Sequence, residues 1–255
     1  MDRVSGLSVF RADLHIHTVL SPCGDIEMTP RHIVAKAKAC GLDIIGISDH
    51  NTTRQCAEVK KVGERENLLV LCGAEVTTRE EVHCLAFFET PAALAAFQCF
   101  LDARLPAVEN RAELFGYQLL IDEYERVLET VPYLLITALT AGLDEVAQEV
   151  HRLDGIFIPA HIDKARNGLL SQLGFVPPAL QAEALELSPC TATADFIQQY
   201  PSLAAWSFIH SSDAHVPDEI GRACTELLLR ERNFKEIKNA LHDGRMARKS
   251  MDGNV

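Results

Sequence analysis

Several features that mark common protein classes are missing from this sequence. No apolar run reaches the roughly 18 residues that a transmembrane helix needs. Residues 1–10 lack the basic start and apolar core of a signal peptide. The eight cysteines include no Cys-x-x-Cys pair. A disulfide framework is therefore not expected, and we predict a protein of the reducing cytoplasm with no membrane partner.

Positive charge is also scarce. The chain has 24 Lys and Arg residues against 36 Asp and Glu residues, a formal net charge of −12. Such an acidic chain has little capacity for a broad basic face, so we expect no stable partnership with duplex nucleic acid. Bound metal ions can still supply local positive charge for phosphate chemistry.

The best-known nucleotide and hydrolase motifs are absent. There is no Gly-x-Gly-x-x-Gly, no Gly-x-x-x-x-Gly-Lys-Ser/Thr and no Gly-x-Ser-x-Gly sequence, so dinucleotide, P-loop and serine hydrolase sites have no support. The sequence also has no internal repeat and no linker. Its 255 residues, 47% hydrophobic and 24% charged, are typical of a globular protein. We predict one domain over residues 1–255.

Short apolar runs alternate with helical patterns along the chain. The runs that predict strands are Phe10–His15, Asp43–Ser48, Leu68–Cys72, Val82–Phe88, Ile156–Ala160, Ala184–Leu187 and Trp206–His210. Their near-continuous apolarity is typical of strands covered on both faces, as in a parallel sheet. Helices are predicted at Pro30–Cys40, Pro91–Ala103, Leu143–Leu153 and Asn233–His242. Residues 90–150 are predicted to form a mainly helical insertion, within which 117–130 has no assigned structure.

Metal-binding residue types gather where the predicted strands end. They are His15, His17, Asp49, His50, Glu75, His83, His161, Asp163, Asp213 and His215. In a β/α barrel the carboxyl ends of the strands converge on one mouth, where active sites form. Imidazole suits zinc, iron and manganese, and a carboxylate such as Glu75 can bridge two ions. The pattern therefore predicts a cluster of divalent metal ions.

Each motif taken alone also fits a structural role. The pair His15 and His17 shares one face of a strand, and Asp49 with His50 fits a turn that caps a helix. His83 lies among apolar neighbours, as a core histidine would. The metal interpretation is favoured because so many such residues would otherwise reach strand ends by chance. His32, His151 and His242 fall in helical patterns away from strand ends and are expected to be solvated.

Five segments together resemble the polymerase-and-histidinol-phosphatase (PHP) phosphoesterase family. They are Asp13-Leu-His15-Ile-His17, Ile47-Ser-Asp49-His50, Gly73-Ala-Glu75, Pro159-Ala-His161 and Ser212-Asp213-Ala-His215, and they occur in the family's order. The resemblance implies an α/β fold, a distorted (β/α)7 TIM-like barrel, that holds two or three divalent ions (Mn, Fe or Zn) and hydrolyses phosphate esters. It further implies one ion on His15, His17, Glu75 and Asp213, a second on Glu75, His83 and His161, and a third on His50 and His215.

One departure concerns the third ion. Some relatives supply a further His or Asp five or six residues beyond the second histidine; this chain has Cys23 at the six-residue offset and Asp25 two residues further on. Either residue is a candidate ligand. Among the cations, Lys164, Arg166 and Arg222 follow the motifs and are candidates to bind the substrate.

The expected activity is hydrolysis of a small phosphorylated substrate by a metal-activated hydroxide, with Asp213 or His215 handling the proton. Nucleotides or short oligonucleotide ends rank ahead of sugar phosphates and histidinol phosphate, an order that rests on the family resemblance. The region 90–150 is expected to select the leaving group. Two alternatives stay open: hydrolysis of a carbon–nitrogen bond on a similar barrel, and a non-catalytic metal-binding accessory module.

Overall fold

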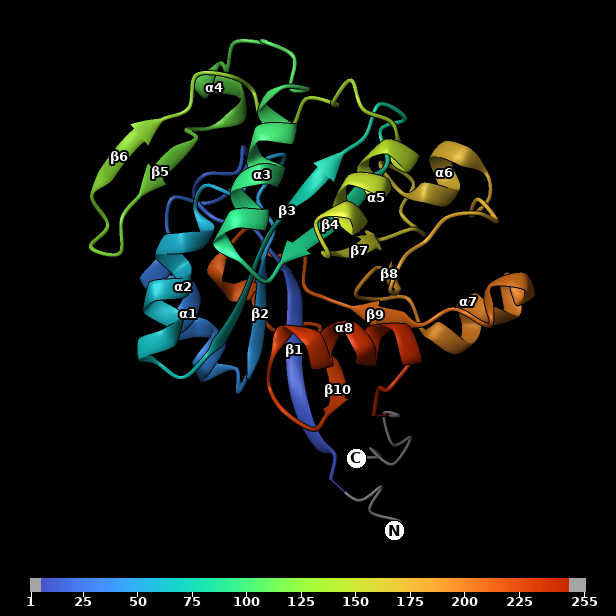
Figure 1. The fold of residues 1–255 in the computed structure, drawn as a ribbon. Helices are drawn as coiled ribbons and strands as arrows, with labels where there is room; N and C mark the ends of the chain where they lie inside the picture. The colour runs from blue at the N-terminus through green and yellow to red at the C-terminus, as the bar shows by residue number, and fades with distance from the viewer. Residues whose placement is uncertain (1–5, 248–255) are drawn as a thin grey trace.

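A six-stranded curled sheet forms the centre of the computed structural model, which describes residues 6–247 (Figure 1). Both ends of the predicted domain 1–255, and part of the segment 1–10, lie outside the described residues. The strand order is β10-β1-β2-β3-β4-β7. The strands are β1 (Ser8–Ile16), β2 (Ile44–Ile47), β3 (Leu69–Thr77), β4 (His83–Phe88), β7 (Ile156–Pro159) and β10 (Thr225–Leu229).

The directions of these strands differ from the parallel sheet that the sequence favoured. Strands β1, β2 and β3 are parallel, but β4 is antiparallel to both β3 and β7, and β10 is antiparallel to β1. Only residues 78–82 join β3 to β4, which is too short for the crossover that parallel neighbours need. As a result, the start of β4 lies at the same edge as the ends of β1, β2, β3 and β7.

A second, parallel pair of strands continues this edge. Strands β8 (Leu185–Leu187) and β9 (Phe208–His210) pair with each other. An isolated parallel bridge between Ile16 and Ala214 joins the end of β1 to the segment after β9. Each segment that carries a PHP-like motif is thereby brought to one rim of the curled sheet.

The main helices begin where the sequence offers a cap. Thr29 and Thr90 accept hydrogen bonds from backbone N–H groups of α1 (Pro30–Ala39) and α3 (Pro91–Asp102), and proline fills the first position of both helices. The predicted helices at 143–153 and 233–242 are α5 (Leu143–Arg152) and α8 (Phe234–Asp243). The structure adds α2 (Cys56–Arg65), α4 (Ala112–Phe115), α6 (Leu169–Leu173), α7 (Thr193–Gln199) and two 3-10 turns at Pro201–Leu203 and Pro217–Glu219. No helix in the described part of the chain is long and apolar enough to span a membrane.

The region 90–150 is less helical than predicted. Between α3 and α5 it contains the short α4 and an antiparallel hairpin of β5 (Leu119–Ile121) and β6 (Val127–Thr130). The sequence analysis did not predict this hairpin. Every residue of β6 is exposed, so its sequence shows no alternation of apolar and polar positions. Buried Gln55 ties the hairpin to α2: its side chain donates to the carbonyl of Ile121 and accepts from the same residue's N–H.

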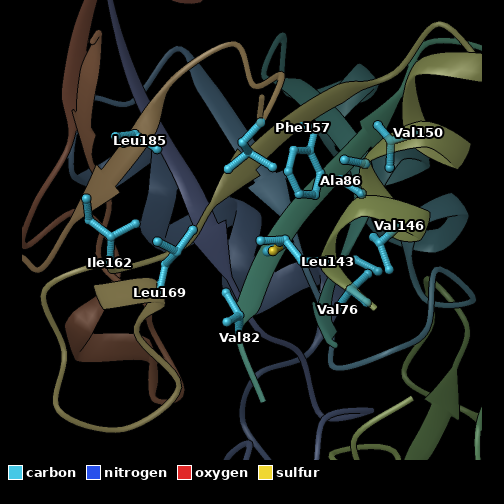
Figure 2. Close-up of a cluster of buried hydrophobic side chains, with 14 of the residues drawn as sticks. Val76, Val82, Ala86, Leu143, Val146, Val150, Phe157, Ile162, Leu169 and Leu185 are labelled. Carbon is cyan, nitrogen blue, oxygen red and sulfur yellow. The ribbon is translucent and has the colours of Figure 1, made fainter. Parts of the chain in front are cut away.

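Apolar side chains cover both faces of the main sheet, which explains the continuous apolarity of its strands. One cluster packs Phe157 and Ala86 against Val146 and Val150 of α5 (Figure 2). A second joins β1, β4 and β7 to α8, and a third places α1 and α2 over β1, β2 and β3. The strands that carry the polar motifs are therefore held rigidly.

A substitution at Gly73 tests how tightly β3 and β4 are packed. A Cβ at Gly73 would stand 1.9 Å from the carbonyl oxygen of Ala86 on β4, so Gly73→Ala forces the paired strands apart. We expect the free energy of unfolding, measured by urea denaturation, to fall by about 3 kcal/mol. In the control Gly174→Ala the added Cβ meets nothing within 4 Å. In that variant the free energy of unfolding should fall by only about 1 kcal/mol, the cost of placing a side chain on a residue with left-handed backbone. Equal losses would contradict this account.

Candidate metal centre

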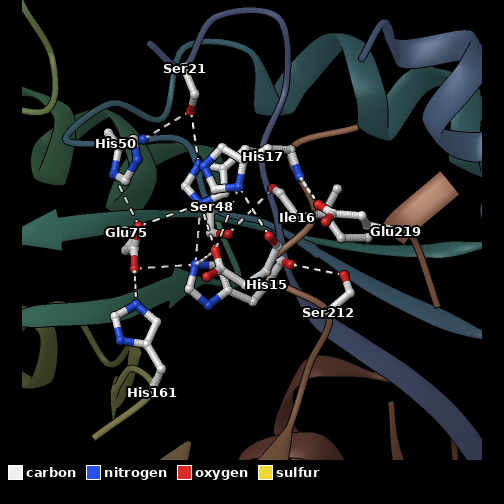
Figure 3. Close-up of polar contacts among 12 residues, drawn as sticks. His15, Ile16, His17, Ser21, Ser48, His50, Glu75, His161, Ser212 and Glu219 are labelled. Atoms are coloured by element: carbon white, nitrogen blue, oxygen red, sulfur yellow. Dashed lines mark hydrogen bonds and ion pairs between the residues drawn. The ribbon is translucent and has the colours of Figure 1, made fainter. Parts of the chain in front are cut away.

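The candidate ligands from all five motifs lie together at the rim of the sheet. Figure 3 shows those of the first four motifs around Glu75. His15 belongs to β1 and His17 follows it, while His50 follows β2. Glu75 is within β3 rather than after it, because β3 continues to Thr77. His83 is the first residue of β4 and reaches the rim because that strand runs in the opposite direction. His161, Asp213 and His215 lie in the loops that follow β7 and β9.

Glu75 occupies the middle of this cluster and is 1% exposed. Its two carboxylate oxygens are each close to histidine nitrogens. Oε1 lies 2.8 Å from His83 Nδ1, 3.1 Å from His161 Nε2 and 3.2 Å from His15 Nε2, while Oε2 lies 3.0 Å from His50 Nδ1 and 3.4 Å from His17 Nε2. A carboxylate with both oxygens surrounded by imidazoles has the arrangement of a bridging ligand.

Three sets of side chains bring one donor atom each to within 4.8 Å of one another. The sets are His15, His17 and Asp213; His50, Glu75 and His83; and His17, His50 and His215. The first set contains His15, His17 and Asp213 but lacks Glu75, the fourth residue that the sequence interpretation gave to that ion. In the second, His50 takes the place that the sequence interpretation gave to His161, although His161 still contacts Glu75. In the third, His17 joins His50 and His215. The assignment of each residue to an ion remains a prediction.

Charge is distributed unevenly among the histidines. Burial opposes protonation of His15, but the carboxylates of Glu186, Glu75 and Asp213 outweigh it and raise the pKa of His15 well above its usual value. Burial also opposes protonation of His17, yet its hydrogen bonds to Asp213 and Glu75 raise the pKa of that imidazole too. For Glu75 burial favours the neutral acid, but His83 and His15 hold its pKa well below the usual range. Glu75 is therefore ionised.

Two other imidazoles stay neutral. Burial, followed by the positive charge of His17, lowers the pKa of His50 to about 4 and that of His215 to about 3. Nδ1 of His50 faces Glu75 Oε2 at 3.0 Å, whereas the buried Nδ1 of His161 has no hydrogen-bond partner among the described residues. Buried polar atoms without partners are costly. The neutral imidazoles of His50 and His215, beside ionised Glu75 and Asp213, are donors that fit Zn²⁺, Fe²⁺ or Mn²⁺.

Glu186 is a buried functional residue that the sequence analysis missed. It lies in β8, and its Oε2 accepts hydrogen bonds from His15 Nδ1 (2.9 Å) and from the backbone N–H of His161 (3.0 Å). It thereby directs His15 Nε2 toward Glu75 and Asp213. A single carboxylate inside the apolar run Ala184–Leu187 was the available signal. Carboxylates that orient metal-binding histidines in this way raise metal affinity.

Two candidate ligands have structural roles instead. Asp49 accepts hydrogen bonds from Thr18 N, Thr18 Oγ1 and Ser21 Oγ, and so holds the loop after His17. Asp163 accepts from the backbone and hydroxyl of Ser188 and from Thr191. Neither belongs to a close set of donors among the described residues, because their carboxylate oxygens are already satisfied.

Asp13 also acts on the loop that carries Asp213. Its carboxylate accepts from the backbone N–H groups of Ser212 and Gly221, each at 2.9 Å. Burial raises the pKa of Asp13 to about 6 despite these hydrogen bonds. The first motif therefore fixes the last one in space.

Neither candidate extra ligand is part of a donor set within the described residues. Cys23 is exposed as a residue, but neighbouring atoms partly shield its thiol from water. This desolvation, together with the negative charges of Glu75 and Asp213, raises the pKa of the thiol to about 11. It is therefore protonated at neutral pH. Asp25 donates its backbone N–H to the carbonyl of His215 (2.9 Å), while its carboxylate accepts from Glu27 N.

The candidate substrate-binding cations differ in position. Lys164 forms an ion pair with Oδ2 of Asp213, so its ammonium group lies at the cluster. Arg222 donates to the carbonyl of Ser212 at 3.1 Å and pairs with Glu219 at 2.7 Å. Arg166 is exposed.

Glu186 offers a test of the metal centre that does not depend on activity. We expect Glu186→Gln to weaken binding of Mn²⁺ or Zn²⁺ by about 10–100-fold, because the amide removes the negative charge that supports His15. Metal titration by calorimetry measures the change. Glu183→Gln in the same segment is the control, since its carboxylate accepts from Phe157 N, away from the donor sets. Unchanged affinity in Glu186→Gln would contradict the positioning role.

Comparison with known proteins supports the motif resemblance. The model of the PHP domain matches residues 13–198, and the model of a PHP-associated region matches residues 207–246. The uncharacterized protein YqxK of Bacillus subtilis is 27% identical over 264 residues, which cover 90% of this chain and 61% of that protein. The uncharacterized protein MJ1587 of Methanocaldococcus jannaschii is 38% identical over 78 residues, or 28% of this chain and 46% of that protein. The chain thus spans less than two thirds of these relatives.

Solved structures share the fold. The lesion-specific endonuclease Q of Pyrococcus furiosus superposes with a TM-score of 0.69 at 20% identity, covering 92% of this chain and 56% of that one. A two-domain protein of Bacteroides vulgatus, described as containing a PHP-like metal-dependent phosphoesterase, gives a TM-score of 0.58 at 17% identity, with coverage of 96% and 66%. With the PHP model matched over most of its length, this chain belongs to the PHP domain family.

Proposed function

We propose that this protein is a metal-dependent hydrolase of phosphate esters. The observation that carries the proposal is the buried, ionised Glu75 with imidazoles around both carboxylate oxygens. When bound, divalent ions polarise the phosphoryl oxygens and lower the pKa of a water molecule that attacks phosphorus. His15, His17 and Asp213 would hold one ion, and His50, Glu75 and His83 would hold another. His161, which contacts Glu75, would join the second set, and His215 would bind beside His17 and His50.

The chain's own charged groups would position the substrate and move the proton. The ammonium of Lys164, paired with Asp213, supplies a positive charge for a phosphoryl oxygen. Burial would favour the protonated acid at Asp213, but His15 and His17 hold its pKa far below the usual range. Asp213 is therefore ionised and His215 is neutral at neutral pH, so each has an unprotonated atom to which the proton could be transferred. Arg222 lies beside the same loop, next to Ser212, and is the second candidate substrate cation.

The proposed substrates are small phosphate esters, with nucleotides or short oligonucleotide ends ahead of sugar phosphates and histidinol phosphate. The net charge of −12 supports this choice, since it offers no long cationic track for a duplex backbone. A second candidate is cleavage of duplex DNA. It is favoured by the fold shared with endonuclease Q, a relative whose structure was solved with a 27-mer duplex carrying an abasic lesion at the active site.

A substrate screen with Mn²⁺ separates these candidates. We expect phosphate release from nucleoside monophosphates and bisphosphates, histidinol phosphate or short single strands. Amides should not be hydrolysed. Glu75→Ala should lower the rate by about 10²–10³-fold, because it removes the charge between two dications. Glu64→Ala, an exposed carboxylate on α2, is the control and should keep full activity. Cleavage of abasic duplex DNA alone would favour the second candidate, and no hydrolysis of any phosphate ester would refute the proposal.

Metal content and its pH dependence provide a separate check. Elemental analysis should find two or more divalent ions per chain after anaerobic purification with Mn²⁺, and fewer than one would contradict the proposal. Because the pKa values of His15 and His17 are raised, metal binding must displace protons from them. The affinity for Mn²⁺ should therefore keep rising from about pH 6.5 to 8, above the pKa of an ordinary imidazole. His50 and His215 release no proton in this range. An affinity that is constant above pH 6.5 would contradict the assignment.

A further inference from the structure

A cavity of about 570 Å³ is lined in part by the segment that follows His17, one of the candidate metal ligands. Its walls come from residues 19–26, from the segment 114–117 at the end of α4, and from Ile136. Residues 19–26 directly follow His17. The backbone N–H of Asp25 donates to the carbonyl of His215 (2.9 Å), and that of Cys23 donates to the carbonyl of Phe115 (3.0 Å). One wall of the cavity is therefore hydrogen-bonded both to a candidate metal ligand and to α4.

The lining is apolar and unusually exposed. Ile26, Leu114 and Tyr117 are 62%, 59% and 62% exposed, and Phe115 contributes a second aromatic ring. Large apolar side chains gathered at an open surface commonly mark a binding site. The volume is within the range of small-molecule pockets, about 300–1,000 Å³.

The charges around the cavity narrow the choice of ligand. Among the residues that the structure describes, no Lys or Arg lines it, and the one charged lining residue is Asp25, whose carboxylate accepts from Glu27 N. A second phosphate would find no positive charge there. Sugar hydroxyls would find few free polar partners. A flat aromatic group, in contrast, can stack on Tyr117 or Phe115 without needing charge.

We propose that this cavity binds the nucleobase of a nucleoside phosphate whose phosphate lies at the metal centre. The proposal deepens the phosphoesterase function and rests on it for the position of the phosphate. It assigns specificity to Tyr117 and Phe115 in the segment 114–117, within the region 90–150 that carries no sequence motif. The metal centre then supplies the affinity for phosphate, and the cavity selects the leaving group.

Paired substrates test the role of Tyr117. Adenosine 5′-monophosphate and ribose 5-phosphate share the phosphate and the sugar but differ in the base. Tyr117→Ala should lower kcat/KM for the nucleotide at least about fivefold, the effect of losing one stacking contact, and leave ribose 5-phosphate unchanged. Tyr124→Ala is the matched control, since Tyr124 is equally exposed but lies outside the cavity. Equal losses for both substrates, or no loss for either, would overturn the proposal.

Binding of adenosine separates this proposal from the phosphoesterase function. Adenosine has no phosphate, so saturation-transfer NMR on the protein without added metal reports on the cavity alone. We expect transfer to the adenine protons that is lost in Tyr117→Ala and kept in Tyr124→Ala. If the wild-type protein binds adenosine in this way but hydrolyses no phosphate ester, the phosphoesterase function fails and the base site stands. If adenosine does not bind, the base site is wrong.

Discussion

The charge on Glu75 is the constraint around which this site is organised. A carboxylate that is 1% exposed is very costly unless positive groups or metal ions surround it. The structure meets this cost with imidazoles from four separate segments placed around both oxygens. Burial, together with the positive charge of His17, keeps His50 and His215 neutral. Divalent ions would satisfy the carboxylate and the free nitrogens together.

The backbone provides the precision that such a cluster needs. Strand β3 is paired along its length with β2 and β4, and helices cover both faces of the sheet. Buried Asp13 and Asp49 use their carboxylates to fix the loops after β9 and β1. These two residues lie inside the PHP-like motifs without belonging to a donor set among the described residues. The motifs therefore combine groups that fit metal with groups that position them.

An acidic chain can still have a site for phosphate, because positive charge is needed only at the metal centre and not over the whole surface. Bound cations would supply concentrated positive charge at the centre, with Lys164 beside it. The apolar cavity lined by the segment after His17 adds contact area without adding charge. A small phosphate ester whose leaving group carries an aromatic base suits this combination better than a long polyanion, which needs positive charge along its length. With the proposed function, the net charge of −12 would act against nonspecific binding of nucleic acid.

The sequence by itself determined which candidate ligands to look for, and the structure brings them together at one rim of the sheet. His15, His17, Glu75 and Asp213 stand in local patterns, and short apolar runs place them near strand ends. Helices with clear caps, such as α1 and α3, were equally predictable because their signals lie within a few residues. These features are local in the chain, so one sequence suffices to find them.

Only the tertiary structure decided which groups meet. The reversed direction of β4 brings His83 to the rim, and no local pattern states how strands pair. Glu186 acts on a histidine that is 171 positions away in the chain, through a contact that exists only after folding. The β5–β6 hairpin depends on the distant anchor Gln55, and the segment of α4 beside the cavity is held by the backbone N–H of distant Cys23, which donates to the carbonyl of Phe115. Periodicity reports burial, whereas register and long-range hydrogen bonds choose the partners.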